Sequence, residues 1–207
     1  MLSKNSKERD NLLKQIHNKV VALEESPLYV YRVANNYLPV VGGGSHMAKI
    51  MFVGEAPGRN EAKTGKPFCG SAGKILDLLL DEVGLTREEI YITNIVKDRP
   101  QKNRDPLPEE IKIYGPFLDR QIDIIQPQVI ATLGRYSTKY ILEKFGLPEA
   151  RQPIGELHGK VFEAQAPYGK VYLVPLYHPA AAIYNRKLID VLKLDFKVLE
   201  KLKQNAY

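Results

Sequence analysis

The chain has 207 residues, a formal net charge of +6 and a single cysteine, Cys69. This length suffices for one domain with its own core, and one cysteine excludes an intramolecular disulfide framework and fits a reducing, intracellular setting. No apolar segment reaches the roughly 18–20 residues of a membrane span, no signal peptide is predicted from the polar start, and the positive charge is compatible with a polyanionic partner.

The first predicted element is an amphipathic helix within residues 1–25. From Glu8 to Leu23, apolar residues recur at helical spacing, with Lys and Asn on the opposite face. The glycine-rich segment Gly42–Met47 predicts a flexible loop. Because no repeat or low-complexity tract follows, we expect residues 1–207 to form a single domain.

Four short apolar segments then predict buried strands, and helical patterns lie between them. The strands are expected at Lys49–Glu55, Ile90–Val96, Val129–Leu133 and Val171–Tyr177. The helices are expected at Ala72–Leu85, Pro108–Ile125, Tyr136–Phe145 and Asn185–Gln204. Nearly continuous apolar strands that alternate with helices are typical of a parallel sheet covered on both faces. The sequence therefore predicts a three-layer α/β/α sandwich with a mainly parallel, four-stranded central sheet.

Polar residues follow the predicted strands at the points where they end. Glu55 ends the first strand, Asn94 lies near the end of the second, and His178 follows the last. Ligands bind beyond the carboxyl ends of parallel strands, although each residue alone could merely cap a helix or tie a loop. Three different functional groups at one edge favour a site.

The segment Gly54–Gly73 is the densest in glycine and proline. A Walker A motif is excluded there, because Lys74 is followed by Ile75 and the position of the required first glycine holds Phe68. Small residues that open the next helix, Gly70 and Ser71, favour a phosphate contact through free backbone N–H groups.

Ordered motifs run along most of the chain. They are Gly54–Gly58 with Glu61, Gly65–Gly73, Tyr91–Pro100, Asn103–Pro106, Leu133–Gly134 and His178–Ala181. Together these motifs resemble the family-four uracil-DNA glycosylases, from about Pro27 onward. The resemblance implies a monofunctional enzyme that removes uracil from DNA and leaves an abasic site.

The resemblance also implies a role for each residue of a uracil pocket. Phe68 would stack on a flipped-out uracil and Asn94 would read its Watson–Crick edge, with Ala56 in the same pocket. Glu61 would exclude the C5 methyl group of thymine. His178 would donate to uracil O2 while Glu55 stabilises the cationic sugar and orients water. The structural alternatives are an apolar wedge for Phe68, a loop tie for Asn94 and a solvated Glu61.

Contacts with DNA are expected mainly at phosphates. Besides Gly70 and Ser71, the candidates are the turn Gly134–Arg135 and the basic residues Lys97 and Arg99. Ile183 or Tyr184 would enter the space that the flipped nucleotide leaves. The alternatives are a solvated charged face for the basic residues, and helix-core positions for Ile183 and Tyr184.

The chain departs from the family at the four cysteines that hold an iron–sulfur cluster. The matching positions are Leu23, Ser26, Asp98 and Tyr114. None of these side chains replaces a thiolate, so we predict no cluster and no other cofactor or metal. We expect Tyr114 to fill the vacated volume and Asp98 to pair with a nearby base.

The leading hypothesis is therefore a uracil-DNA glycosylase of base excision repair, acting inside the cell as a monomer on single- or double-stranded DNA. The first alternative is a DNA-binding protein of the same fold that is catalytically silent or accepts a broad range of deaminated bases. The second, a domain that binds small nucleotides, lacks a complete phosphate or dinucleotide fingerprint.

Overall fold

Four buried strands form the centre of one sheet in the computed structural model, which describes residues 5–206. These strands are β2 (Ile50–Gly54), β3 (Tyr91–Asn94), β4 (Val129–Leu133) and β6 (Gly169–Leu176). They pair in parallel in the order β3-β2-β4-β6. Parallel pairing brings all four carboxyl ends to one edge, so the residues that follow these strands lie near one another.

The sheet is larger than the sequence predicted, because six strands form it and the two outermost are antiparallel. The edge strands are β1 (Gly43–Gly44) and β5 (Phe162–Ala166). Burial in β5 alternates along the strand, as expected for an edge strand with one solvated face. Part of Gly42–Met47 therefore pairs with β3, where a flexible loop was expected.

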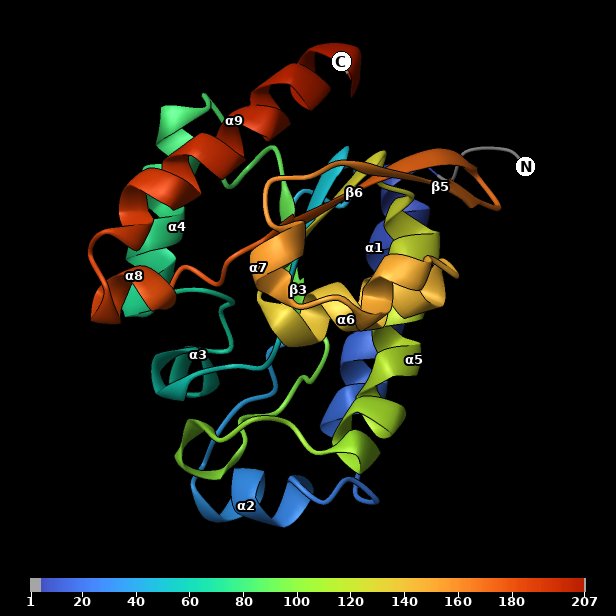
Figure 1. Cartoon of the computed structure of the whole chain (residues 1–207). Helices are drawn as coiled ribbons and strands as arrows, with labels where there is room; N and C mark the ends of the chain where they lie inside the picture. Colours follow the sequence, from blue (N-terminus) through green and yellow to red (C-terminus); the bar gives the residue numbers. More distant parts are fainter. Residues whose placement is uncertain (1–4, 207) are drawn as a thin grey trace.

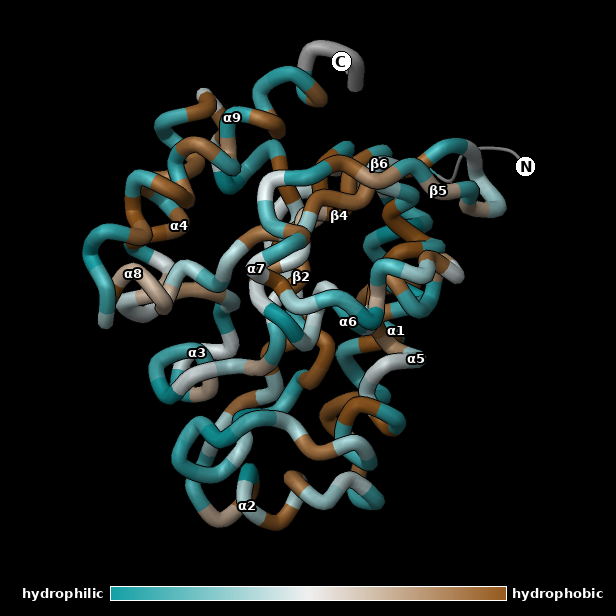
Figure 2. Tube along the Cα trace, viewed as in Figure 1, coloured by the Kyte–Doolittle hydropathy of each residue, from teal (hydrophilic) through white to brown (hydrophobic). Residues whose placement is uncertain are grey.

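Helices cover both faces of the sheet, which confirms the three layers (Figure 1). On one face lie α1 (Ser6–Val21), α5 (Pro108–Ile125) and α6 (Arg135–Lys144), and on the other lie α4 (Ser71–Glu82) and α9 (Leu188–Ala206). Alternate residues of β2 enter the two separate cores. Figure 2 shows hydrophobic residues gathered along the central strands, whereas hydrophilic residues are frequent in the outer helices and loops.

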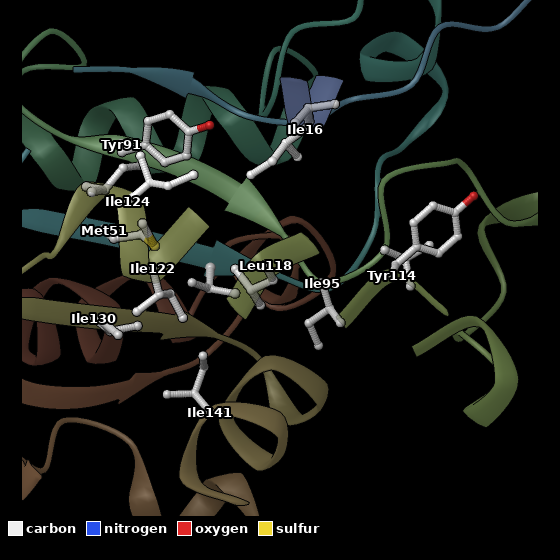
Figure 3. Close-up of a cluster of buried hydrophobic side chains, with 14 of the residues drawn as sticks. Ile16, Met51, Tyr91, Ile95, Tyr114, Leu118, Ile122, Ile124, Ile130 and Ile141 are labelled. Carbon is white, nitrogen blue, oxygen red and sulfur yellow. The ribbon is translucent and has the colours of Figure 1, made fainter. Parts of the chain in front are cut away.

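The core beneath α1 and α5 ends at Tyr114. Figure 3 shows Ile16, Met51, Leu118 and Ile122 packed together, with Tyr114 at the margin and its hydroxyl group pointing away from them. Tyr114 is nevertheless fully buried. The hydroxyl group must therefore find polar partners inside the protein.

Predicted and observed boundaries agree closely for the long elements. Pro108–Ile125 and Val129–Leu133 match, and the other long elements differ by one to three residues at either end. The first helix begins at Ser6, and residues 1–4 of the predicted N-terminal segment lie outside the described part. Short helices without periodicity were missed: α2 (Tyr29–Ala34), α3 (Arg59–Thr64), α7 (Ile154–Leu157), α8 (Ala181–Tyr184) and the 3-10 turns Gln101–Asn103 and Pro148–Arg151. Within residues 5–206, no helix combines the length and apolarity that crossing a membrane requires.

Candidate active site

A cavity of about 440 Å³ opens at the carboxyl edge of the sheet. Glu55, Asn94 and His178 all line it, from positions beside the ends of β2, β3 and β6. Gly54 lies opposite Asn94 in the parallel register, which sets Glu55 beside the end of β3. The structure thus brings together the three polar residues that the strand ends indicated.

Asn94 supplies an unused hydrogen-bond acceptor to this cavity. The side chain is 1% exposed, and its Oδ1 has no hydrogen-bond partner among the described residues. Gly54 leaves room for this oxygen, since a Cβ at that position would lie 2.3 Å from Oδ1 and 2.8 Å from Cζ of Phe68. Because buried acceptors are costly when unpaired, this oxygen favours a ligand that brings an N–H or O–H donor.

Phe68 forms an aromatic wall of the cavity. The ring lies 5.7 Å from the imidazole of His178, centroid to centroid, at an interplanar angle of 30°. Phe68 holds the left-handed region at φ 47°, a conformation uncommon outside glycine. Arg87 stabilises it, donating from Nη2 to the Phe68 carbonyl at 2.6 Å while its Nε pairs with Asp77. Arg87 lies outside the sequence motifs and was not predicted.

His178 is a neutral hydrogen-bond donor in this cavity. Burial lowers the pKa of His178 to about 4, although the charge of Glu61 opposes the shift. Nδ1 accepts a hydrogen bond from the Ala180 amide at 3.1 Å, so in the neutral ring the proton resides on Nε2. Gly134 permits close packing here, since its φ is +95° and a Cβ would lie 3.2 Å from Cβ of His178.

Glu55 is a partly buried carboxyl group whose pKa is raised toward neutrality. Burial raises the pKa of Glu55 to about 7, the charge of Asp105 adds to the rise and that of Arg135 opposes it. Asp105 forms an ion pair with Arg135 and accepts a hydrogen bond from Tyr136 at 3.1 Å. A group with this pKa can bear a proton or a negative charge at pH 7, as an acid–base residue must. Asp105 lies within the motif Asn103–Pro106 but was not predicted as a site residue.

Glu61 is buried at 8% exposure and braces the wall of the cavity. Its Oε1 accepts a hydrogen bond from the Gly70 amide at 2.7 Å. A purely solvated Glu61 is therefore excluded, and its expected exclusion of a C5 methyl group stays a prediction. Ala56 also lines the cavity.

The structure corrects several expected phosphate contacts. The amides of Gly70 and Gly134 are used internally, the latter by the Leu176 carbonyl at 2.8 Å. Lys97 is fully buried, and Arg99 is 5% exposed. The guanidinium group of Arg99 donates to two tyrosine hydroxyls and to Asn103. None of these groups can meet a phosphate without rearrangement.

Other expected DNA contacts do lie at the surface. Ser71 is exposed at the start of α4, and the side chain of Arg135 is 64% exposed although it is paired with Asp105. Ile183 and Tyr184 are 45% and 90% exposed, which excludes core positions for them. Tyr184 also lines the cavity.

Three of the four positions at which the resemblance places cluster cysteines meet in one buried cluster, which consists of Ser26, Asp98 and Tyr114 with Arg32 and is called the Tyr114 network. Tyr114 donates to Asp98 at 2.6 Å and lies 2.7 Å from Oγ of Ser26, while Arg32 pairs with Asp98 at 3.2 Å. Leu23 is buried in the adjoining apolar core. The predicted pairing of Asp98 with a nearby base is confirmed. Tyr114 is fully buried, and its filling of a vacated volume stays a prediction.

These residues do not fit an iron–sulfur cluster. Thiolates hold such clusters, whereas a carboxyl group, a phenol, a hydroxyl and an isobutyl group stand here, and the polar ones contact each other directly. In residues 5–206, no group of three or more His, Cys, Asp or Glu side chains is arranged to hold a metal ion.

Sequence comparisons show which known proteins this chain is similar to. A sequence model of the uracil DNA glycosylase superfamily matches residues 41–203. A type-4 uracil-DNA glycosylase of Sulfurisphaera tokodaii is 46% identical over 191 residues, covering 92% of this chain and 84% of that protein. Another, of Archaeoglobus fulgidus, is 43% identical over 84% of this chain and 85% of its own length. A third, of Thermotoga maritima, is 37% identical over 94% of this chain and 95% of its own length.

Proposed function

Because the chain belongs to the uracil-DNA glycosylase superfamily, we propose that it hydrolyses the C1′–N1 bond of a flipped-out uracil in DNA and leaves an abasic site. One observation carries the proposal: the unpaired Oδ1 of Asn94 lies in a cavity with the aromatic ring of Phe68 and a neutral His178. Phe68 offers a ring face on which a base can stack, Asn94 offers polar atoms that can read its edge, and His178 offers a hydrogen-bond donor for the leaving base.

Recognition of the base follows from the carboxamide of Asn94. Uracil presents N3–H as a donor and O4 as an acceptor, so N3–H would meet Oδ1 and O4 would meet the amide group. Cytosine reverses this pattern and would leave the buried oxygen unpaired. Phe68 would stack on the base, while Ala56 and Glu61 shape the pocket wall, Glu61 beside C5.

Cleavage of the bond needs stabilisation of opposite charges on the base and the sugar. When the C1′–N1 bond breaks, its electron pair stays on N1, and the charge spreads onto O2, where the Nε2–H of His178 donates a hydrogen bond. The carboxylate of Glu55 stabilises the oxocarbenium-like sugar and accepts a proton from the water that adds to C1′. Among the residues that the structure describes, no lysine lines the cavity, in keeping with hydrolysis and not a covalent amine intermediate.

The surface beside the cavity suits a DNA duplex. The free N–H groups at the start of α4 around Ser71, together with Arg135, would meet phosphates. Exposed Ile183 and Tyr184 on α8 would fill the space from which the nucleotide leaves.

We also propose that the enzyme acts without the iron–sulfur cluster that type-4 enzymes normally carry. The single cysteine and the Tyr114 network support this proposal. Elemental analysis of purified protein should detect no stoichiometric iron, and one cluster equivalent per chain would contradict the proposal.

The test of the proposed function is an excision assay on a labelled oligonucleotide that holds one uracil. After incubation, alkali cleaves any abasic site, and Glu55→Gln provides the matched inactive control. We expect scission with U·G, U·A and single-stranded substrates, and hypoxanthine and xanthine oligonucleotides define the lesion range. Specific binding in a gel shift without scission, across varied salt and temperature, would instead support the catalytically silent protein.

A further inference from the structure

Lys97 is a fully buried lysine that forms no ion pair with any described carboxylate. Its Nζ donates to three oxygens: Oγ1 of Thr93 at 2.8 Å, the main-chain oxygen of Asn94 at 2.6 Å and Oε1 of Gln121 at 2.6 Å. Burial alone lowers the pKa of the amine well below its usual range, and the charge of Asp119 opposes this shift. Burial of this amine therefore costs free energy of desolvation that an apolar side chain of similar size would avoid.

Three hydrogen-bond acceptors surround Nζ. Gln121 donates from Nε2 to the Val41 carbonyl at 2.8 Å and to the Tyr91 hydroxyl at 3.0 Å, which turns its Oε1 toward Lys97. Thr93 donates to the same Val41 carbonyl at 2.7 Å, which leaves its lone pairs for Lys97. An ammonium has three N–H donors for these three acceptors, whereas a neutral amine has only two.

One of these hydrogen bonds reaches the residue that reads the base. No hydrogen bond holds Oδ1 of Asn94, so the direction of the carboxamide depends on its backbone and on packing. Lys97 binds the main-chain oxygen of Asn94, and the next amide, of Ile95, donates to Gly54 at 3.0 Å. The Asn94–Ile95 peptide is thereby fixed on both sides.

We propose that Lys97 is a positioning residue for base recognition, whose hydrogen bond from Nζ fixes the main chain of Asn94 and so aims its carboxamide into the cavity. This inference rests on the proposed function, because the ligand it prepares for is uracil. Lys97 touches no substrate, and its effect is expected on chemistry and base affinity and not on the affinity for DNA phosphates.

Lys97→Met tests the inference, because methionine keeps the apolar stem and removes the amine. We expect a kcat for excision about 100-fold lower at an unchanged KM for DNA, since a misplacement of about 1 Å can cost that much. Calorimetry with free uracil should show a matching loss of affinity. Ile16→Ala, which leaves a cavity in the core under α1, is the control for lost stability and should keep kcat per folded molecule.

If Lys97→Met does not fold, the double variant Lys97→Met/Gln121→Leu replaces both buried partners with apolar groups, while Thr93 still donates to Val41. A folded double variant should again show the low kcat and weak uracil binding. Wild-type kcat and uracil affinity in either folded variant would overturn the role of Lys97. Failure of the wild type to excise uracil would overturn the proposed function instead, and uracil calorimetry would still test Lys97.

Discussion

Tyr114→Phe removes a single hydroxyl group from the Tyr114 network and keeps the ring. That hydroxyl donates to buried Asp98 at 2.6 Å, so Ser26, at 2.7 Å, must be the donor to Tyr114. Both hydrogen bonds disappear in the variant, and Arg32 alone then satisfies the carboxylate. Because the packing of the ring is unchanged, any loss of stability reports on the hydroxyl group.

The expected loss in the free energy of unfolding is about 3 kcal/mol. A hydrogen bond to a buried charged group contributes roughly 1.5–3 kcal/mol, and one between neutral groups roughly 0.5–1.5 kcal/mol. For a chain of this size, about 3 kcal/mol lowers the melting temperature by roughly 6–12 °C.

Urea unfolding followed by far-UV circular dichroism measures this loss, with the slope against urea as a check on two-state behaviour. The control is Tyr29→Phe, whose exposed hydroxyl forms only a 3.3 Å hydrogen bond to Glu24, and we expect a change below about 0.5 kcal/mol. Equal midpoints and slopes for Tyr114→Phe and the wild type would refute the stabilising role of the network.

Three further predictions concern the cavity. Glu55→Gln should abolish excision and flatten the pH dependence of stability. Burial raises the pKa of Glu55 from 4.5 to about 7, so the wild type should lose stability as pH rises between these values. Urea midpoints measured from pH 4 to pH 8 test this, and a midpoint that falls as steeply with pH in the variant as in the wild type would contradict it. Asn94→Asp should shift recognition toward cytosine, whose exocyclic amine needs an acceptor; excision from paired uracil and cytosine oligonucleotides measures the ratio, and an unchanged ratio would remove Asn94 as the base reader. Gly54→Ala should stay folded by circular dichroism yet bind free uracil at least tenfold more weakly, since its Cβ would lie 2.3 Å from Oδ1 of Asn94; wild-type affinity would show that this oxygen is not needed.

The sequence predicted the site best where the fold itself does the positioning. Glu55, Asn94 and His178 lie 39 and 84 residues apart along the chain, yet each lies at or just after the end of a strand of the parallel sheet. Once the strands are recognised, their carboxyl ends must share one edge. The buried Tyr114 network was foreseeable in part for a similar reason, since a missing set of ligands leaves a volume that other side chains must fill.

The basic residues near Asn94 show what the sequence cannot reveal. Lys97 and Arg99 look like a charged surface loop, but the partners that bury them come from distant segments, including Gln121 for Lys97 and Tyr31 and Tyr37 for Arg99. The pattern of charged residues along the sequence does not indicate which distant residues will contact them. The edge strand β5 was missed for a different reason: its alternating polar residues do not resemble the continuous apolar strands used to find the sheet.

The Tyr114 network also bears on how the chain regains its structure after unfolding. Thiolate ligands bound to iron would need the metal and sulfide to be supplied again, because a cluster lost in the unfolded state does not return from the polypeptide alone. The hydrogen-bonding groups of Ser26, Asp98 and Tyr114 are parts of the polypeptide, although 88 residues separate the first from the last. Dilution out of urea should therefore restore the native protein under air, in buffer that contains only the chain itself.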